Sequence, residues 1–226
     1  MAIVIAIDGP AGAGKSTIAR RLAARLGFTY IDSGAMYRAV ALWALREKLD
    51  PSDRHRMEQL ALAAGIMLKD DGARVLLNGE DVTEAIRTPE VSSAASRIAV
   101  IPAVRRAMVA KQREIGRRTS VVMEGRDIGT VVFPQAAVKV FLDARPEERV
   151  RRRLADERAR GGAVSEGQVA EQMKERDQRD STRRDAPLSQ APDAVYFDST
   201  AMPVEEVEDA ILKIVRSRVS NGQEAG

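Results

Sequence analysis

The stretch that decides the fold is Gly9-Pro10-Ala11-Gly12-Ala13-Gly14-Lys15-Ser16, with Thr17 directly after it. It matches the phosphate-loop pattern G-x-x-x-x-G-K-[ST] in full. The preceding residues, Ala2–Ile7, are apolar and rich in β-branched side chains, which predicts a buried parallel strand. The following residues, Ser16–Leu26, carry apolar side chains at helical spacing up to Gly27. Strand, loop and helix together predict a nucleoside triphosphate site in a P-loop α/β fold.

The chemistry of this loop assigns a task to each of its parts. Its three glycines permit positive φ and let backbone N–H groups converge on phosphate oxygens. The helix start adds partial positive charge, and Lys15 can reach the β- and γ-phosphates. The Ser16 hydroxyl can bind Mg²⁺, and Thr17 offers a hydroxyl beside the α-phosphate. We therefore expect residues 9–17 to bind ATP, with Lys15 catalytic and Ser16 a metal ligand.

The composition excludes several other chemistries. The chain has 226 residues, 44% of them hydrophobic, which suffices for a core in one domain or one domain with an insertion. Its 36 basic and 33 acidic residues leave a net charge of only +3, which disfavours a polybasic nucleic-acid or membrane binder. No cysteine is present, so disulfides and thiolate chemistry are excluded, and the single histidine, His55, is expected to face solvent. We attribute the excess of Arg over Lys mainly to composition.

The initial apolar run is also too short for a signal segment or a membrane span. We therefore expect a soluble, cytoplasmic chain without a membrane partner.

The rest of the chain alternates short apolar strands with helices, which predicts a parallel β-sheet core flanked by helices. Strands are expected at 28–31, 120–123, 138–142 and 194–197, and helices at 35–47, 54–64, 89–100, 102–116, 147–160, 165–183 and 203–219. Two further runs, 66–68 and 75–77, flank Asp70-Asp71-Gly72 and predict a β-hairpin insertion. In such folds ligands bind at the carboxyl ends of the strands.

Three further clusters lie where this sheet edge is expected and predict a second, phosphorylated ligand. Residues 32–38, DSGAMYR, open a helix with Ser33 as its expected N-cap and an arginine one turn later. Residues 125–130, GRDIGT, place opposite charges between two glycines, which favours a fixed, ligand-facing loop. Residues 175–184 carry arginines along one helical face, a spacing that suits a polyanion. An ordinary capped helix and a solvated, salt-bridged helix are the alternatives for the first and third clusters.

A phosphate loop alone fits GTPases, motor ATPases, nucleic-acid translocases and small-molecule kinases. The chain lacks the Asn/Thr-Lys-x-Asp motif of guanine recognition, and its length with the loop near the start favours a compact kinase. Two alternatives stay open: a kinase for another small acceptor such as UMP, and an ATP-regulated nucleic-acid-binding module using residues 145–184. The second is disfavoured because acidic residues interleave there and no aromatic platform occurs.

Taken in order, five segments resemble the bacterial cytidylate (CMP/dCMP) kinases, a family of P-loop nucleoside monophosphate kinases. They are IDGPAGAGKST (7–17), DSGAMYRAV (32–40), VTEAIRTPEVSSAAS (82–96), GRDIGTVVFP (125–134) and ERDQRDSTRRDAPL (175–188). The resemblance runs from about Ile3 to Val215. It implies the reaction ATP + CMP ⇌ ADP + CDP with Mg²⁺, in a monomer that binds small molecules and no nucleic acid.

The resemblance also implies roles for individual residues. The acceptor phosphate would bind Ser33, Tyr37, Arg38 and Arg126. The cytosine edge would contact Ser96, Arg105 and Asp127. Arg176 and Asp180 would approach the ribose, and Arg183 the phosphates, so that Lys15, Arg126, Arg176 and Arg183 form the catalytic set. Glu124 departs from the aspartate common at this position of the family, which leaves its role toward a Mg²⁺-bound water open.

The same resemblance divides the single unit of residues 1–226 into functional parts. The core would comprise about 1–34, 102–145 and 190–219, and the NMP-binding region 35–101, with the β insertion at 65–78. A helical lid would span about 155–185, with Gly161-Gly162 as its break, and 220–226 would be a disordered tail. Phosphoryl transfer needs positioning and charge neutralisation more than a nucleophile, so the lack of cysteine fits this chemistry.

Overall fold

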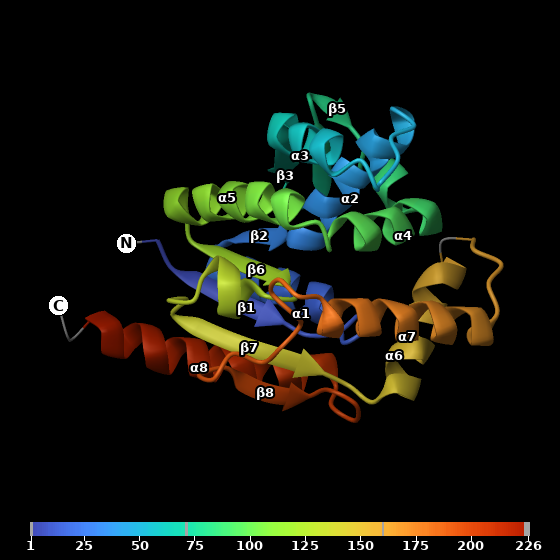
Figure 1. Ribbon diagram of the computed structural model, residues 1–226. Helices are drawn as coiled ribbons and strands as arrows, with labels where there is room; N and C mark the ends of the chain where they lie inside the picture. Colours follow the sequence, from blue (N-terminus) through green and yellow to red (C-terminus); the bar gives the residue numbers. More distant parts are fainter. Residues whose placement is uncertain (1, 71, 160, 224–226) are drawn as a thin grey trace.

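The computed structural model describes residues 2–70, 72–159 and 161–223, and its central sheet confirms the predicted α/β class. Five parallel strands lie in the order β2-β6-β1-β7-β8 (Figure 1). Their bounds are Val4–Asp8 for β1, Thr29–Asp32 for β2, Val121–Gly125 for β6, Val138–Asp143 for β7 and Val195–Asp198 for β8. The strand that precedes the phosphate loop is thus the central one, with β6 and β7 as its neighbours.

One face of the sheet is covered by α1 (Lys15–Leu26) and α8 (Val204–Gln223). Ile5 and Ile7 of β1 point into this layer and have no exposed surface, as the two-residue period of a strand requires. Buried Glu208 of α8 accepts hydrogen bonds from two arginines of α1. The helix that carries the phosphate loop is therefore held between the sheet and α8.

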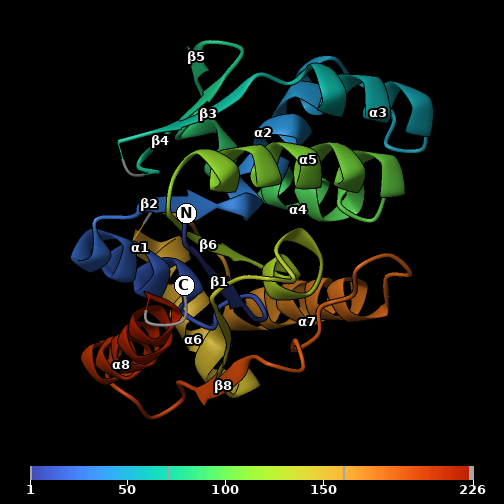
Figure 2. The ribbon, with the colours of Figure 1, turned by 90° about the vertical axis from the view of Figure 1, so that its left-hand side faces the viewer.

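The opposite face is covered by α2, α4 and α5, which Figure 2 shows on the far side of the sheet from α8. Their bounds are Ser33–Arg46, Pro89–Ile98 and Pro102–Arg118. Val4 and Ala6, the alternate residues of β1, point into this second layer with Met123 of β6. The sheet is thus buried on both faces, as its continuous apolar strands predict.

A separate three-stranded antiparallel sheet, β3-β4-β5, confirms the predicted insertion. The strands are Ile66–Lys69, Arg74–Leu77 and Glu80–Asp81, preceded by α3 (Arg54–Ala63) and followed by the short 3-10 turn Ala85–Arg87. The sequence pattern does not predict the two-residue β5 or the 3-10 turn. Asp71, in the expected hairpin turn, lies outside the described residues.

Helices α6 (Pro146–Ala159) and α7 (Glu166–Thr182) pack on each other beside the phosphate loop (Figure 1). The predicted capping box at the start of α7 is present, because Ser165 and Gln168 bond reciprocally to each other's backbone N–H.

At the other end of the chain, a disordered tail was expected over 220–226. Helix α8 instead continues to Gln223, and residues 224–226 lie outside the described part. None of the helices in the described part of the chain is long and apolar enough to cross a membrane.

Two leucines, both in helices, differ in how much of their surface is exposed. Leu22 of α1 has no exposed surface, whereas Leu62 of α3 is 60% exposed. Leu22→Ala should lower the free energy of unfolding by about 2–5 kcal/mol, because it removes packed methyl groups and leaves a cavity. Leu62→Ala should change it by less than about 0.5 kcal/mol. Denaturant titration of both variants tests this, and equal losses would contradict the assignment of the core.

Candidate active site

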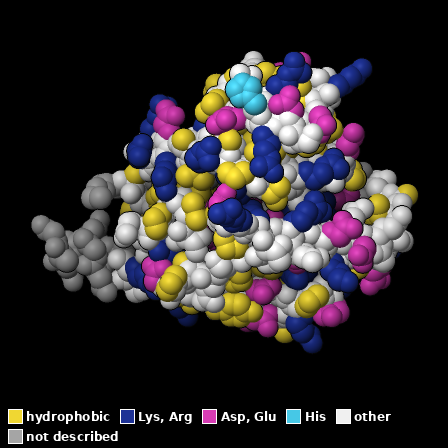
Figure 3. Space-filling view, viewed as in Figure 1, with side chains coloured by type: hydrophobic (Ala, Val, Ile, Leu, Met, Phe, Trp, Pro, Cys, Tyr) yellow, Lys and Arg dark blue, Asp and Glu magenta, His cyan; other side chains and the backbone are white. Residues whose placement is uncertain are grey.

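The carboxyl ends of the central strands open into a cleft of about 1090 Å³. The strand registers bring these ends level, since Asp8 lies opposite Gly125 and Asp32 opposite Glu124. Figure 3 shows Lys and Arg side chains gathered where the face over α5 meets α7. A cleft at this edge, lined by basic residues, is suited to phosphorylated ligands.

The phosphate loop has the predicted conformation. Gly12 and Gly14 have φ values of +75° and +89°, a region that glycine occupies without strain. At Gly9 a Cβ atom would lie 1.9 Å from the carbonyl oxygen of Leu142, so this position has no room for a side chain. Residues 11–17 line the cleft, whereas Gly9 and Pro10, which the sequence also assigned to ATP, are not among its lining residues.

Lys15 is buried in this loop, and its ammonium donates to the Pro10 carbonyl over 2.6 Å. Burial lowers the pKa of Lys15 to about 7, and repulsion by Arg126 acts in the same direction. Glu124 opposes this shift by attraction. Without a bound anion, Lys15 therefore carries only part of its charge near neutral pH.

The start of α2 differs from the prediction in one detail. Asp32, not Ser33, is the N-cap: its carboxylate accepts the Ala35 N–H over 2.9 Å and also pairs with Arg38 over 2.7 Å. Ser33 is the first helical residue, and its hydroxyl donates to the Glu124 carbonyl over 2.6 Å. The helix start is thus fixed to β6, with Arg38 held at the cleft.

Tyr37, one turn into α2, also lines the cleft. Burial raises the pKa of its hydroxyl to about 12, so Tyr37 is a neutral hydrogen-bonding group there.

A second polar group lies where α4 and α5 meet the cleft. Arg105 of α5 forms a buried ion pair with Asp127, and Arg183 approaches the other oxygen of Asp127 at 3.6 Å. The Ser96 hydroxyl of α4 is buried beside them and has no hydrogen-bond partner within the described part of the chain. These four residues leave a polar pocket whose donors and acceptors are incompletely used.

Three arginines converge on one carboxylate between the two groups. Asp180 of α7 accepts a hydrogen bond from Arg126 over 3.0 Å, and Arg176 and Arg183 lie 3.9 and 3.7 Å from its oxygens. Burial alone would raise the pKa of Asp180, but Arg126 and Arg176 hold it below its usual value. Together with the pair of Arg105 and Asp127, four arginines share two carboxylates here, which leaves net positive charge.

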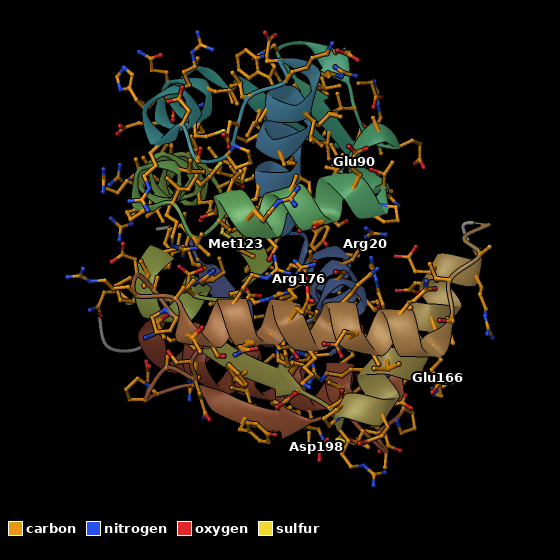
Figure 4. The ribbon with its side chains drawn as sticks, turned by 45° about the vertical axis from the view of Figure 1, so that its right-hand side comes forward. Arg20, Glu90, Met123, Glu166, Arg176 and Asp198 are labelled. Atoms are coloured by element: carbon orange, nitrogen blue, oxygen red, sulfur yellow. The ribbon has the colours of Figure 1, made fainter. Side chains whose placement is uncertain are left out.

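Arg176 is the least satisfied of the three. Figure 4 shows it rising from α7 into the space beneath α4. Its Nε is buried without a hydrogen-bond partner among the described residues. Burial, followed by repulsion from Arg126, lowers the pKa of Arg176 to about 9. An anion bound here would relieve both penalties.

The structure places two arginines of α6 against the phosphate loop that the sequence motifs did not indicate. Arg149 of α6 donates to the phosphate-loop carbonyl of Ala11 over 3.1 Å and to Asp177 of α7 over 2.5 Å. Arg152, one turn later, donates to Ser199. Both lie in the charged helix that the sequence places before the lid, but no local signal distinguishes them from its solvent-exposed arginines.

Two carboxylates also lie at the strand ends. The sequence motifs did not indicate Asp8, and they left the role of Glu124 open. Asp8 accepts the N–H groups of Ile128 and Gly129, and burial raises its pKa to about 6. Glu124 accepts a hydrogen bond from the Tyr30 hydroxyl, and burial raises the pKa of Glu124 as well. The one feature of the sequence that could have indicated Asp8 is its position directly before the phosphate loop.

The described residues contain no group of three or more His, Asp or Glu side chains able to hold a metal ion. Ser16 is exposed in the cleft at the start of α1, beside Glu124. A metal ion here would take most of its ligands from a bound phosphate and from water.

Comparison with known proteins gives a consistent result. Residues 5–217 match the family model described as cytidylate kinase. A cytidylate kinase from Solibacter usitatus is 72% identical over 98% of this chain and 96% of its own length. One from Pelotomaculum thermopropionicum is 52% identical over 97% and 96%.

Among solved structures, an uncharacterized protein from Eubacterium ventriosum has the same fold. Its TM-score is 0.51 at 15% identity, over 95% of this chain and 99% of that one.

The lowered pKa of Lys15, about 7, predicts that triphosphate binding takes up a proton. At pH 8 most Lys15 is neutral, and a bound anion raises its pKa, whereas the phosphates, with a last pKa of about 6, are already ionised. Calorimetric titration with ATP in two buffers of different ionisation enthalpy should therefore give an uptake of about one proton per site. The Lys15→Met variant is the control, and an equal uptake in both proteins would contradict the assignment.

Proposed function

The chain belongs to the cytidylate kinase family, and from that premise we propose that it transfers the γ-phosphoryl group of ATP to CMP or dCMP, giving ADP and CDP or dCDP. The observation that carries the proposal is a set of buried donors in one cleft that have no hydrogen-bond partner within the described part of the chain: Ser96 Oγ, Arg176 Nε and Arg183 Nη2. Leaving such a group unpaired costs about 1–3 kcal/mol. A ligand with a base at one end and phosphates at the other would supply the missing partners.

The donor half of the cleft is assigned to ATP, bound by residues 9–17. Lys15 would leave the Pro10 carbonyl, its partner in this structure, for the β- and γ-phosphates. The loop N–H groups and the start of α1 would contribute further positive potential. Arg149 and Arg152 border the same loop and would contact the donor side from α6.

The acceptor phosphate is assigned to Ser33, Tyr37, Arg38 and Arg126. The first three lie on the first turns of α2, and Arg126 follows β6, so they approach from two directions. The pairing of Arg38 with Asp32 holds its guanidinium ready at the cleft. A phosphate arriving there would replace solvent around donors that are already ordered, which lowers the entropic cost of binding.

The base is assigned to Ser96, Arg105 and Asp127. A carboxylate accepts hydrogen bonds, so Asp127 suits the exocyclic amine of cytosine and opposes the carbonyl oxygen of uracil at the same place. Arg105 fixes the orientation of that carboxylate through the buried ion pair. Asp180 and Arg176 would lie beside the ribose, between base and phosphates.

Catalysis would consist of positioning and charge neutralisation. The acceptor oxygen belongs to a phosphate that is already anionic, so no strong general base is required. Lys15, Arg126, Arg176 and Arg183 would surround the transferring group, and the hydrogen bond between Arg126 and Asp180 fixes the direction of one of them. Closure of α6 and α7 over the cleft would exclude water and prevent hydrolysis of ATP.

Ser16 would hold the Mg²⁺ that accompanies ATP. Its hydroxyl is exposed in the cleft, and the donor set around it fits an ion that keeps phosphate oxygens and water as most of its ligands. When bound, the ion neutralises charge on the β- and γ-phosphates. Residues for both substrates come from one chain, which supports a monomer as the active unit.

Relative rates with different acceptors test the base assignment. CMP and dCMP should exceed UMP in kcat/KM by about tenfold or more, because uracil leaves buried polar groups unpaired. AMP should be poorer still, because a two-ring purine holds its exocyclic amine farther from the ribose than cytosine does. A preference for AMP would refute the cytosine assignment, and equal rates with UMP would show that the amine is not recognised.

Two substitutions test the machinery. Lys15→Ala should lower kcat by about 100-fold or more, because a preorganised charge at the transferring group is lost. Arg126→Ala should lower kcat and raise the KM for CMP together. Arg106→Ala is the matched control, since the side chain of Arg106 is 71% exposed and lies outside the cleft. Near-normal kinetics of Lys15→Ala, with its fold intact by circular dichroism, would refute the donor assignment.

A further inference from the structure

Asp8 is a buried carboxylate to which the proposed mechanism gives no task. It is the last residue of β1 and is only 5% exposed. Its two oxygens accept the backbone N–H groups of Ile128 and Gly129 over 2.8 and 2.7 Å. These residues are 120 and 121 positions away in sequence. Asp8 therefore joins the strand of the phosphate loop to the segment that follows Arg126 and Asp127.

The segment that it contacts is a single π-helical turn, Ile128–Val132. The first N–H groups of any helical turn have no acceptor within the turn, and an aspartate at the N-cap usually supplies one. Asp127 occupies that N-cap position, but its side chain makes no capping hydrogen bond. It pairs with Arg105 and faces Arg183 instead.

We infer that Asp8 is a positioning residue of the acceptor site, which caps the turn at Ile128 from another strand and so leaves Asp127 free to face the cleft. The inference rests on the proposed function, because the acceptor assignment gives Asp127 its task. If Asp127 had to cap its own turn, its carboxylate would point toward the N–H groups of Gly129 and Thr130, the second and third residues of the turn, and Gly129 N–H is one of the two groups that Asp8 binds. The guanidinium of Arg105 would then lose its carboxylate partner in the pocket.

Packing around the turn supports this role. A Cβ atom on Gly129 would lie 3.4 Å from an oxygen of Asp8 and 3.1 Å from Cδ of Lys139, so the turn backbone sits directly on these two side chains. Lys139 is itself fixed by the Pro134 carbonyl at 2.6 Å and by Asp193 at 2.9 Å. The turn is thus supported from β1 and β7, and Asp8 supplies the hydrogen bonds.

A rival role for Asp8 is support of the phosphate loop, since Gly9 follows it directly. The two roles predict different kinetics. If Asp8 caps the turn at Ile128, its loss should weaken the binding of CMP. If Asp8 supports the phosphate loop, its loss should weaken the binding of ATP. Asp8→Ala removes both acceptor oxygens, and Asp8→Asn keeps one. Asp53→Ala is the matched control, because Asp53 also caps a helix by accepting one N–H, at α3 outside the cleft.

Steady-state kinetics and amide hydrogen exchange of these variants test the inference. Asp8→Ala should raise the KM for CMP by about tenfold or more and Asp8→Asn by less, with the KM for ATP within about twofold of the parent, because unpaired N–H groups displace only the acceptor loop. The amides of Ile128 and Gly129 should exchange about tenfold faster or more in Asp8→Ala. Asp53→Ala should leave both KM values and these amides unchanged.

An unchanged KM for CMP in a folded Asp8 variant, or equal increases in both KM values, would overturn the inference. If Asp8→Ala does not fold, Asp8→Asn decides by the same two criteria. Failure of the proposed function appears separately, as a parent protein that does not phosphorylate CMP. In that case the exchange rates alone decide whether Asp8 caps the turn.

Discussion

Among the described glycines, the tightest packing is at Gly9, where a Cβ atom would lie 1.9 Å from the Leu142 carbonyl oxygen of β7. Because β1 ends this close to β7, the phosphate loop turns directly over the sheet edge and α1 starts beside it. The same crowding recurs at Gly12, where a Cβ would lie 2.7 Å from the Arg149 carbonyl of α6. The lack of side chains at Gly9 and Gly12 thus allows the phosphate loop to pack closely against β7 and α6.

The charge distribution follows from this geometry. A chain with a net charge of only +3 concentrates uncompensated positive charge at one place, because Arg126, Arg176 and Arg183 share Asp180. Burial then makes each missing partner costly. Composition alone explains the excess of arginine on the exposed helices, whereas the proposed function gives a role to the few arginines that reach the cleft. Burial lowers the pKa values of Arg176 and Arg183, which is typical of arginines placed to bind an anion.

The extent to which the sequence predicts this molecule depends on the range of the interactions involved. The phosphate loop, the hairpin insertion and the capping box of α7 are local patterns, and all three are present in the structure. The N-cap of α2 was placed one residue late, because aspartate and serine are adjacent there and both are good caps. The capping role of Asp8 joins segments 120 residues apart, so no local pattern indicates it. The same holds for Arg149, whose partners lie on the phosphate loop and α7.

The central position of β1 has a consequence for how the molecule assembles. The strand at residues 4–8 is synthesised before both of its neighbours in the sheet, residues 121–125 and 138–143. Among the described strands it pairs only with these two, so it has no strand partner until residues 121–125 have been synthesised. Contacts of such long sequence separation slow folding and leave apolar strands open to aggregation. The arrangement that brings all the strand ends to one cleft therefore also delays the pairing of the central strand until β6 and β7 have been synthesised.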